Sequence, residues 1–137
     1  MGLDIGIGDG ASLVPSQDEP RLTLDEEEGY YWHMRPVFER VARLTGQQID
    51  MCTDASFFGT ALDRLATELA VFRDEIQSEP LTWQVHMYST ISRKSKQRLI
   101  ARYRTVERAA FLAKVNQLEW IIARSRRLSR PVVFCGD

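Results

Sequence analysis

The chain has 137 residues, of which 44% are hydrophobic and 27% charged, so it is suited to one globular domain, residues 1–137, and wholesale disorder is excluded. It holds no run of about 18 apolar residues, which excludes a membrane span, and its first residues lack the pattern of a secretory signal, so we expect a cytoplasmic protein. The formal net charge of −1 conceals a division, because residues 1–80 carry 16 acidic and 6 basic side chains whereas residues 81–130 carry 12 basic and 2 acidic ones.

The N-terminal segment predicts a strand followed by a loop. Residues 3–7 alternate apolar with small or polar side chains, which is typical of a strand. The run Gly6-Ile7-Gly8-Asp9-Gly10 invites comparison with a phosphate-binding loop, but such a loop needs a helix directly after its glycines. Residues 11–20 contain two prolines and no helical period. We therefore interpret residues 9–24 as an irregular loop.

An acidic run, Asp25 to Glu28, precedes the first predicted helix. Asp25 and Glu28 have the spacing of a capping box, and acids suit a first helical turn. Proline inside a helix costs about 3 kcal/mol. Either a helix from about residue 26 kinks at Pro36, or the helix starts near Pro36 and residues 30–33 are extended. Apolar residues then recur at helical spacing as far as Leu44, and Gly46 stands where a C-terminal cap belongs.

A second helix shows the clearest periodicity of the chain. Its apolar residues step by four and three positions and give one continuous stripe; they are Phe58, Leu62, Leu65, Leu69, Phe72 and Ile76. Thr53 or Asp54 can cap this helix at its N-terminus.

The fifty residues from 81 to 130 contain neither glycine nor proline, the strongest local breakers of regular structure. Residues 81–88 alternate apolar with polar, so they are a strand or the lead-in to a helix. We predict a helix that starts at Ser89 or Thr90 and continues to about Arg127. It would be about 57 Å long, which exceeds the expected width of the domain. A kink or break is therefore expected near Ser92–Lys96.

The C-terminus predicts a strand that pairs with the N-terminal one. Pro131 ends the long helix, and Val132-Val133-Phe134 is rich in strand-forming residues. Because a two-stranded ribbon is marginal, a third strand is needed, and residues 81–87 are the best candidate. The predicted class is α+β, mainly α, with three or so helices including one long C-terminal helix, and a small sheet that pairs the terminal strands.

No pattern along the chain indicates catalysis or a cofactor. The two histidines, His33 and His86, lack a second ligand at metal spacing. In a chain expected to be cytosolic, we interpret Cys52 and Cys135 as small buried residues rather than as a disulfide. We therefore expect no enzyme, metal or cofactor. An exposed cleft that holds His33, His86 or Cys52 beside acids would favour an enzyme instead.

Two groups of residues are candidates for binding. The first is aromatic and acidic, a combination enriched at protein interfaces through its aromatic members; it comprises Asp25, Glu28, Tyr30, Tyr31, Trp32 and His33. The second is basic and comprises Arg93, Lys94, Lys96, Arg98, Arg102 and Arg104. The basic group could bind nucleic-acid phosphates, pair with acids of the same chain or steer a protein partner. The pI near 6.1 favours pairing within the chain over nucleic acid.

Three fragments of the chain resemble small bacterial immunity proteins of polymorphic toxin systems. They are the opening Met1 to Ile7, the helix fragment Leu65-Ala66-Thr67-Glu68-Leu69 before Pro80 and Trp83, and the closing Arg130-Pro131-Val132-Val133-Phe134. The Asp-rich middle of that group is replaced here by a basic stretch. The resemblance implies a non-enzymatic binder that blocks one protein.

We accordingly expect a cytosolic protein-binding module, immunity-like or regulatory, whose partner is another protein such as a toxin domain, with no membrane contact. The alternative is a nucleic-acid-binding protein that uses a basic helix over residues 93–108. A third possibility is an enzyme whose site is formed only in three dimensions. The oligomeric state is left open.

Overall fold

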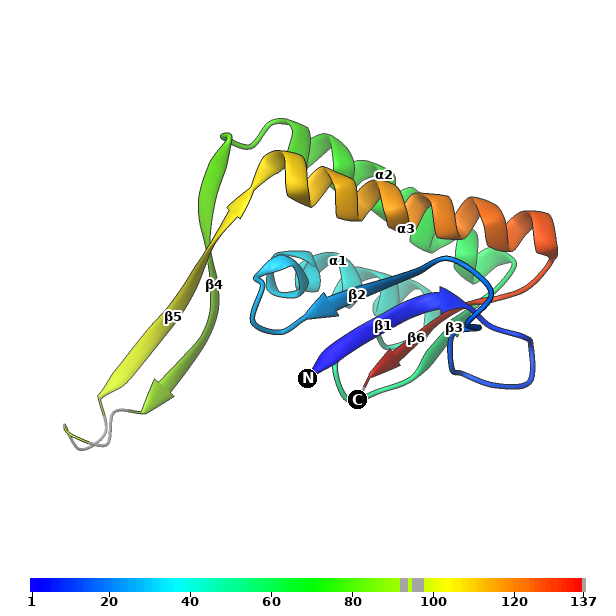
Figure 1. Ribbon diagram of the computed structural model, residues 1–137, viewed down its shortest axis with the longest axis horizontal. Helices are drawn as coiled ribbons and strands as arrows, with labels where there is room; N and C mark the ends of the chain where they lie inside the picture. The colour runs from blue at the N-terminus through cyan, green and yellow to red at the C-terminus, as the bar shows by residue number, and fades with distance from the viewer. Residues whose placement is uncertain (92–93, 95–97, 137) are drawn as a thin grey trace.

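The computed structural model describes residues 1–91, 94 and 98–136, and the described part has three helices and two antiparallel sheets (Figure 1). The α+β class is therefore confirmed. The helices are α1 (Tyr30–Thr45), α2 (Thr60–Gln77) and α3 (Arg108–Leu128). One sheet has the order β2-β1-β6-β3, formed by β2 (Arg21–Asp25), β1 (Gly2–Ile7), β6 (Val132–Gly136) and β3 (Ala55–Phe57). The other consists of β4 (Thr82–Ile91) and β5 (Leu99–Glu107).

The two terminal strands pair as predicted, but their neighbours differ from the prediction. β1 and β6 are antiparallel, with Ile5 opposite Phe134. The predicted third strand, residues 81–87, is wrong, because the four-stranded sheet is completed by β2 and β3 instead. The loop predicted over residues 9–24 is likewise wrong at its end. In β2, Leu22 and Leu24 are buried whereas Arg21 and Thr23 are exposed. The sequence after Pro20 therefore contains a short alternating pattern that is typical of a strand.

Close packing of the loop after β1 requires glycine at position 6. A Cβ atom on Gly6 would lie 2.7 Å from Cβ of Pro15, which is closer than carbon atoms approach. The amide of Ser16 donates to the carbonyl oxygen of Ile7 at 2.8 Å. The loop after β1 therefore folds back against its own strand, and glycine at position 6 makes room for it.

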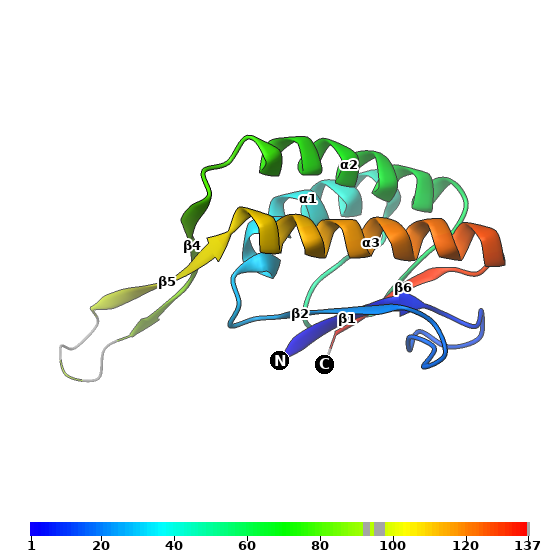
Figure 2. The same ribbon diagram turned by 45° about the horizontal axis from the view of Figure 1, so that its top comes forward.

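All three helices lie over one face of the four-stranded sheet (Figure 2). Helix α1 begins at Tyr30 and contains Pro36, so the alternative in which residues 30–33 are extended is wrong. It ends at Gly46, whose φ of 76° is the left-handed cap that was predicted. The core between helices and sheet includes the aromatic contacts of Phe134 with Phe38 and Phe57, at centroid distances of 6.1 and 5.3 Å.

The predicted apolar stripe of α2 is confirmed from its second member onward. Buried residues of this helix are Leu62, Leu65, Leu69, Phe72 and Ile76. Phe58 is exposed and precedes the helix. The predicted caps Thr53 and Asp54 are wrong, because residues 55–57 first form β3 against β6 and the helix follows Gly59.

The largest difference concerns the predicted helix from residue 89 or 90 to about 127. Its first half is the β4–β5 hairpin, and α3 starts only at Arg108. The predicted break falls on Ser92–Lys96, of which the structure describes Lys94 alone. From Arg108 onward the predicted helix is present, and α3 buries Phe111, Val115, Leu118, Ile121 and Ile122. Within the described residues, no helix combines the length and apolarity needed to cross a bilayer.

Candidate functional site

The β4–β5 hairpin projects from the body of the molecule as an arm, as both ribbon views show (Figures 1 and 2). Its root is anchored, because Val85 and Val106 are buried and the Trp83 ring stacks on Phe111 at 5.9 Å. No third described strand joins these two, so both edges of the arm are open. A hairpin without further support is marginally stable, and the distal arm therefore depends on the anchored root.

The register of the arm separates two faces. Cross-strand pairs place Ile91 opposite Leu99, Ser89 opposite Ala101 and His86 opposite Tyr103. Paired residues share a face, and alternate residues of a strand return to it. We call these six residues the uncharged arm face. Its apolar members are unusually accessible, since Ile91, Leu99 and Tyr103 are 69%, 68% and 55% exposed.

The opposite side of the hairpin carries charge. Here Arg102 lies opposite Tyr88, and Arg104 lies opposite Val85. We call Tyr88, Thr90, Ile100, Arg102 and Arg104 the basic arm face. Arg98 stands directly before β5 and Lys94 lies in the connection between the strands. Arg93 and Lys96, two further residues of the predicted basic group, lie outside the described residues.

A tight turn from Asp25 to Gly29 brings the body against the root of the arm. The Asp25 carboxylate accepts a hydrogen bond from the amide of Glu27 at 2.8 Å, a local turn that aspartate favours. Gly29 has a left-handed φ of 87°. A Cβ atom there would lie 3.1 Å from Cβ of Arg104 and 3.2 Å from Cγ1 of Val106. Glycine therefore permits both the turn and the close approach of β5.

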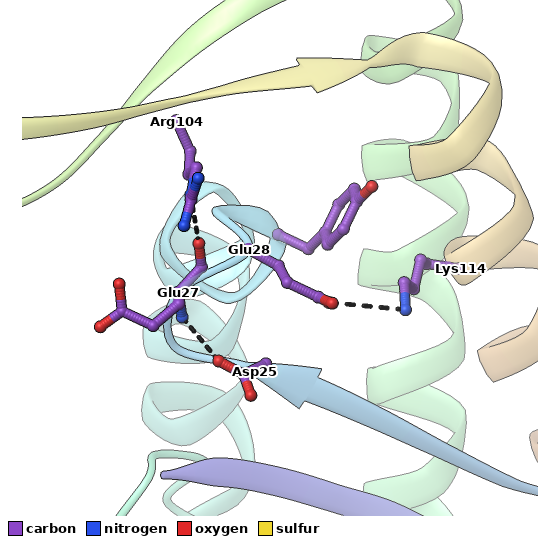
Figure 3. Close-up of a pocket in the computed structure, with 6 residues that line it drawn as sticks. Asp25, Glu27, Glu28, Arg104 and Lys114 are labelled. Atoms are coloured by element: carbon purple, nitrogen blue, oxygen red, sulfur yellow. Dashed lines mark hydrogen bonds and ion pairs between the residues drawn. The ribbon is translucent and has the colours of Figure 1, made fainter.

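This approach creates an open pocket of about 540 Å³ on one side of the arm root (Figure 3). It is lined by Asp25, Glu27, Glu28, Tyr30, Arg104 and Lys114. Arg104 donates from Nε to the main-chain oxygen of Glu27 at 2.6 Å. Figure 3 shows Glu28 reaching toward Lys114, whose Nζ lies 3.8 Å from Oε2. The pocket therefore has both carboxylates and cations in its lining and could contact a partner surface that carries both signs of charge.

The predicted aromatic residues do not gather in one place: Tyr30 lines this pocket, Trp32 contacts the arm, and Tyr31 lies in the core. Trp32 donates from its indole nitrogen to the carbonyl of Glu26 at 2.7 Å and contacts the Tyr88 ring at 5.9 Å. Tyr88 in turn donates to Oε1 of Glu27 at 3.2 Å. Tyr31 is only 4% exposed, so it packs in the core and is not accessible to a partner. Desolvation raises its pKa above the usual tyrosine value.

A second cleft, of about 370 Å³, lies between α1, α2 and β4. It contains both histidines and two carboxylates, His33, His86, Glu75 and Glu79. The His33 ring lies 5.4 Å from Trp83, 5.9 Å from Phe72 and 5.5 Å from Phe111. Burial lowers the pKa of His33 below its ordinary value, although Glu79 and Glu75 oppose that effect.

This second cleft is the arrangement that would favour an enzyme, so its geometry matters. A catalytic histidine is normally oriented by a hydrogen-bonded carboxylate and reaches a nucleophile or water through its other nitrogen. The His86 ring contacts Oγ of Ser89 at 3.5 Å, at the limit of a hydrogen bond. Among the described residues, neither imidazole is hydrogen bonded to a carboxylate.

The charge division is resolved differently in α3 and in the arm. Basic residues of α3 pair with acids of the first half: Arg124 Nε lies 3.1 Å from Glu19 Oε2, and Arg126 Nη2 lies 2.8 Å from Asp63 Oδ1. In contrast, no carboxylate of the described residues lies within ion-pair distance of Arg98 or Arg102. Neutralisation within the chain thus accounts for Lys114, Arg124 and Arg126 of α3 but not for the arm.

The structure brings together parts of both predicted groups, since Asp25, Glu28, Tyr30 and Arg104 line one pocket. His33 lies in the second cleft, and Arg102 lies on the arm. Sequence reasoning missed the uncharged arm face and the contribution of Lys114. The alternation of residues 82–91, taken as a strand, would have indicated the arm face. In the part of the chain that the structure describes, no group of three or more His, Cys, Asp or Glu side chains could hold a metal ion.

Comparison of the chain with protein-family models, curated proteins and solved structures found no match in any of the three.

Proposed function

We propose that this chain is a non-enzymatic, cytosolic protein-binding module whose β4–β5 arm contacts another protein. The observation that carries the proposal is the uncharged arm face, where Ile91, Leu99 and Tyr103 are each more than half exposed on a projecting hairpin. Exposed apolar side chains gathered on one surface mark interaction sites, and burying them against a partner would also stabilise an arm that has no third strand.

The neighbourhood of the arm favours protein over nucleic acid. Its root adjoins the acidic turn, where Asp25, Glu27 and Glu28 line the mixed pocket beside Arg104. Carboxylates repel phosphates, whereas a surface with both signs of charge beside apolar residues is common at protein interfaces. The resemblance to immunity proteins supports a toxin domain as the partner. Cys52 is exposed rather than buried, and an exposed thiol suits a cytosolic location.

Nucleic-acid binding is the second candidate, and one observation favours it. A two-stranded ribbon fits the major groove of DNA, and Arg98 and Arg102 lack a carboxylate partner among the described residues. The basic helix first expected over residues 93–108 is replaced by β5 in this reading, so the ribbon and not a helix would enter the groove.

The experiment compares two variants that each replace two exposed apolar residues by glutamate. Leu99→Glu/Tyr103→Glu alters the uncharged arm face, and Leu44→Glu/Val71→Glu alters exposed helix positions of the body. We expect the partner protein to bind the body variant as tightly as the unmodified chain. Its affinity for the arm variant should be about tenfold lower or more, as for interface hot spots. Isothermal titration calorimetry with the purified partner measures this change.

Fluorescence anisotropy with random duplex DNA tests the alternative. Affinity at low salt that falls steeply as salt rises would favour nucleic acid. Equal affinity of the partner for the arm variant and for the unmodified chain would overturn the proposed role of the arm.

A further inference from the structure

Two carboxylates border the second cleft without a cation to balance them. Glu75 lies in the last turn of α2 and Glu79 two residues beyond its end. The C-terminal end of a helix disfavours negative charge, and like charges four residues apart repel each other. Among the described residues no ion pair involves either glutamate, and the last turn of α2 contains no basic residue. The pair therefore costs stability where it stands, which a ligand of opposite charge would relieve.

The basic side chains nearby already have partners. Arg35 lies over the Trp32 ring, 5.9 Å from its centroid, and forms an ion pair with Glu39 at 3.3 Å. Arg40 lines the cleft but forms an ion pair with Glu68 at 3.1 Å. Arg108 donates to the main-chain oxygen of Glu79 at 2.9 Å, which leaves the Glu79 carboxylate itself unpaired among the described residues. His33 is uncharged at neutral pH because burial lowers its pKa. The cleft thus presents excess negative charge.

Aromatic rings form part of the wall, beside Pro36, Val37 and Val85. Trp32, His33, Phe72 and Trp83 all line the cleft, and the indole nitrogen of Trp83 is buried without a hydrogen-bond acceptor among the described residues. Cations bind over aromatic faces, tryptophan most strongly. Two carboxylates and the Trp83 ring in the lining of one cleft together favour an ammonium or guanidinium group.

The border formed by β4 indicates where such a cation would come from. Residues 83–86 line the cleft, and among the described strands β4 pairs with β5 alone. An open strand edge can accept an extended segment of another chain, whose side chains then enter neighbouring pockets.

We propose that the cleft between α1, α2 and β4 binds an arginine or lysine side chain of the protein partner. This inference rests on the proposed protein-binding function and adds the chemistry of one contact. Glu75 and Glu79 supply the complementary charge, and the Trp83 ring in the cleft wall supplies aromatic surface.

The test uses tryptophan fluorescence of the full chain with Trp120→Phe, which removes a half-exposed tryptophan of α3 outside the cleft. The probes are N-acetylarginine amide and the uncharged N-acetylnorleucine amide. We expect a saturable change with the arginine probe and none with the norleucine probe. In Glu75→Gln/Glu79→Gln the affinity for the arginine probe should fall about fivefold or more, as the loss of two surface ion pairs predicts.

Asp74→Asn is the matched control, because Asp74 is exposed on the same helix end but does not line the cleft; it should leave the affinity unchanged. Circular dichroism checks that every variant is folded. The proposed cation site is overturned by a fluorescence signal that is not saturable, that is equal for both probes, or that the double substitution does not change. Since neither glutamate lies on the arm, such a failure alongside arm-dependent partner binding would leave the proposed function intact.

Discussion

At the scale of single residues, Gly29 links the acidic turn to the arm. Its left-handed backbone alone would cost a side chain about 1 kcal/mol, and the nearby Arg104 and Val106 add a steric term, with Cβ contacts of 3.1 and 3.2 Å. We therefore predict that Gly29→Ala lowers the free energy of unfolding by about 2 kcal/mol or more, measured by urea denaturation.

Gly46 offers the matched control for Gly29. It has a similar φ of 76°, yet a Cβ atom there would meet nothing within 4 Å. Gly46→Ala should therefore lose only the conformational contribution of about 1 kcal/mol. Equal losses for the two variants would mean that β5 does not press against the turn in solution.

His33 makes stability depend on pH. Burial holds its pKa below the reference value of 6.5, so the unfolded chain takes up a proton at a higher pH than the folded chain does. As pH falls below about 6.5, the unfolded state gains protons first and the free energy of unfolding decreases. The decrease stops once pH lies below the pKa of the folded state, and above about 6.5 the residue contributes no slope.

Urea denaturation over a pH series measures this slope in the unmodified chain and in two variants. His33→Gln should remove the contribution, whereas His86→Gln, at the exposed arm, should retain it. A slope that is unchanged in His33→Gln would assign the effect to other groups.

At the scale of elements, the arm should have a stable root and a tolerant outer part. Trp83 stacks on Phe111 at 5.9 Å, whereas Tyr103 is 55% exposed. We predict that Trp83→Ala lowers the free energy of unfolding by about 3 kcal/mol. Tyr103→Ala should change it by about 0.5 kcal/mol or less, as for other surface positions. Thermal unfolding compares the two, and similar losses would contradict this division of the arm.

Some elements could be predicted from the sequence because their pattern has one interpretation. The apolar stripe of α2 repeats at helical spacing over four turns, and these steps of three and four residues do not match the two-residue period of a strand. The arm could not be predicted in this way. Leu99, Tyr103 and Val106 stand four and three positions apart, which imitates a helix face, although in the hairpin Leu99 and Tyr103 share the exposed side. The absence of glycine and proline permits a helix but does not exclude strands.

The candidate site was predictable in its parts and not in its assembly. The acidic and aromatic residues from Asp25 to His33 are conspicuous in the sequence because they are consecutive. Their contact with Arg104 spans 77 positions and depends on the register of β4 with β5, which no local pattern fixes. The same holds for the second cleft, where Glu75 and His33 meet only because α1 and α2 pack together.

At the scale of the whole molecule, ion pairs between the acidic and basic halves of the chain lie along α3 and its C-terminal end. The arginines of the arm have no such carboxylate partners among the described residues. Glu19 is central to the ion pairs of α3, since its carboxylate lies 3.1 Å from Arg124 and 3.9 Å from Arg130 and is only 12% exposed. Removing one partner of an ion pair that is shielded from water lowers the free energy of unfolding more than removing one from an exposed pair, because the remaining charges are left without a partner.

We therefore predict that Glu19→Gln lowers the free energy of unfolding by about 2 kcal/mol, in the range of hydrogen bonds to charged groups. Glu39→Gln removes the exposed pair with Arg35, in which both side chains are more than half accessible, and should cost about 0.5 kcal/mol or less. Because salt screens exposed pairs much more than shielded ones, the Glu19 effect should persist in urea denaturation at high salt. If high salt abolished it, Glu19 would be acting as an ordinary surface charge, and the acidic and basic halves would be held together by the apolar core alone.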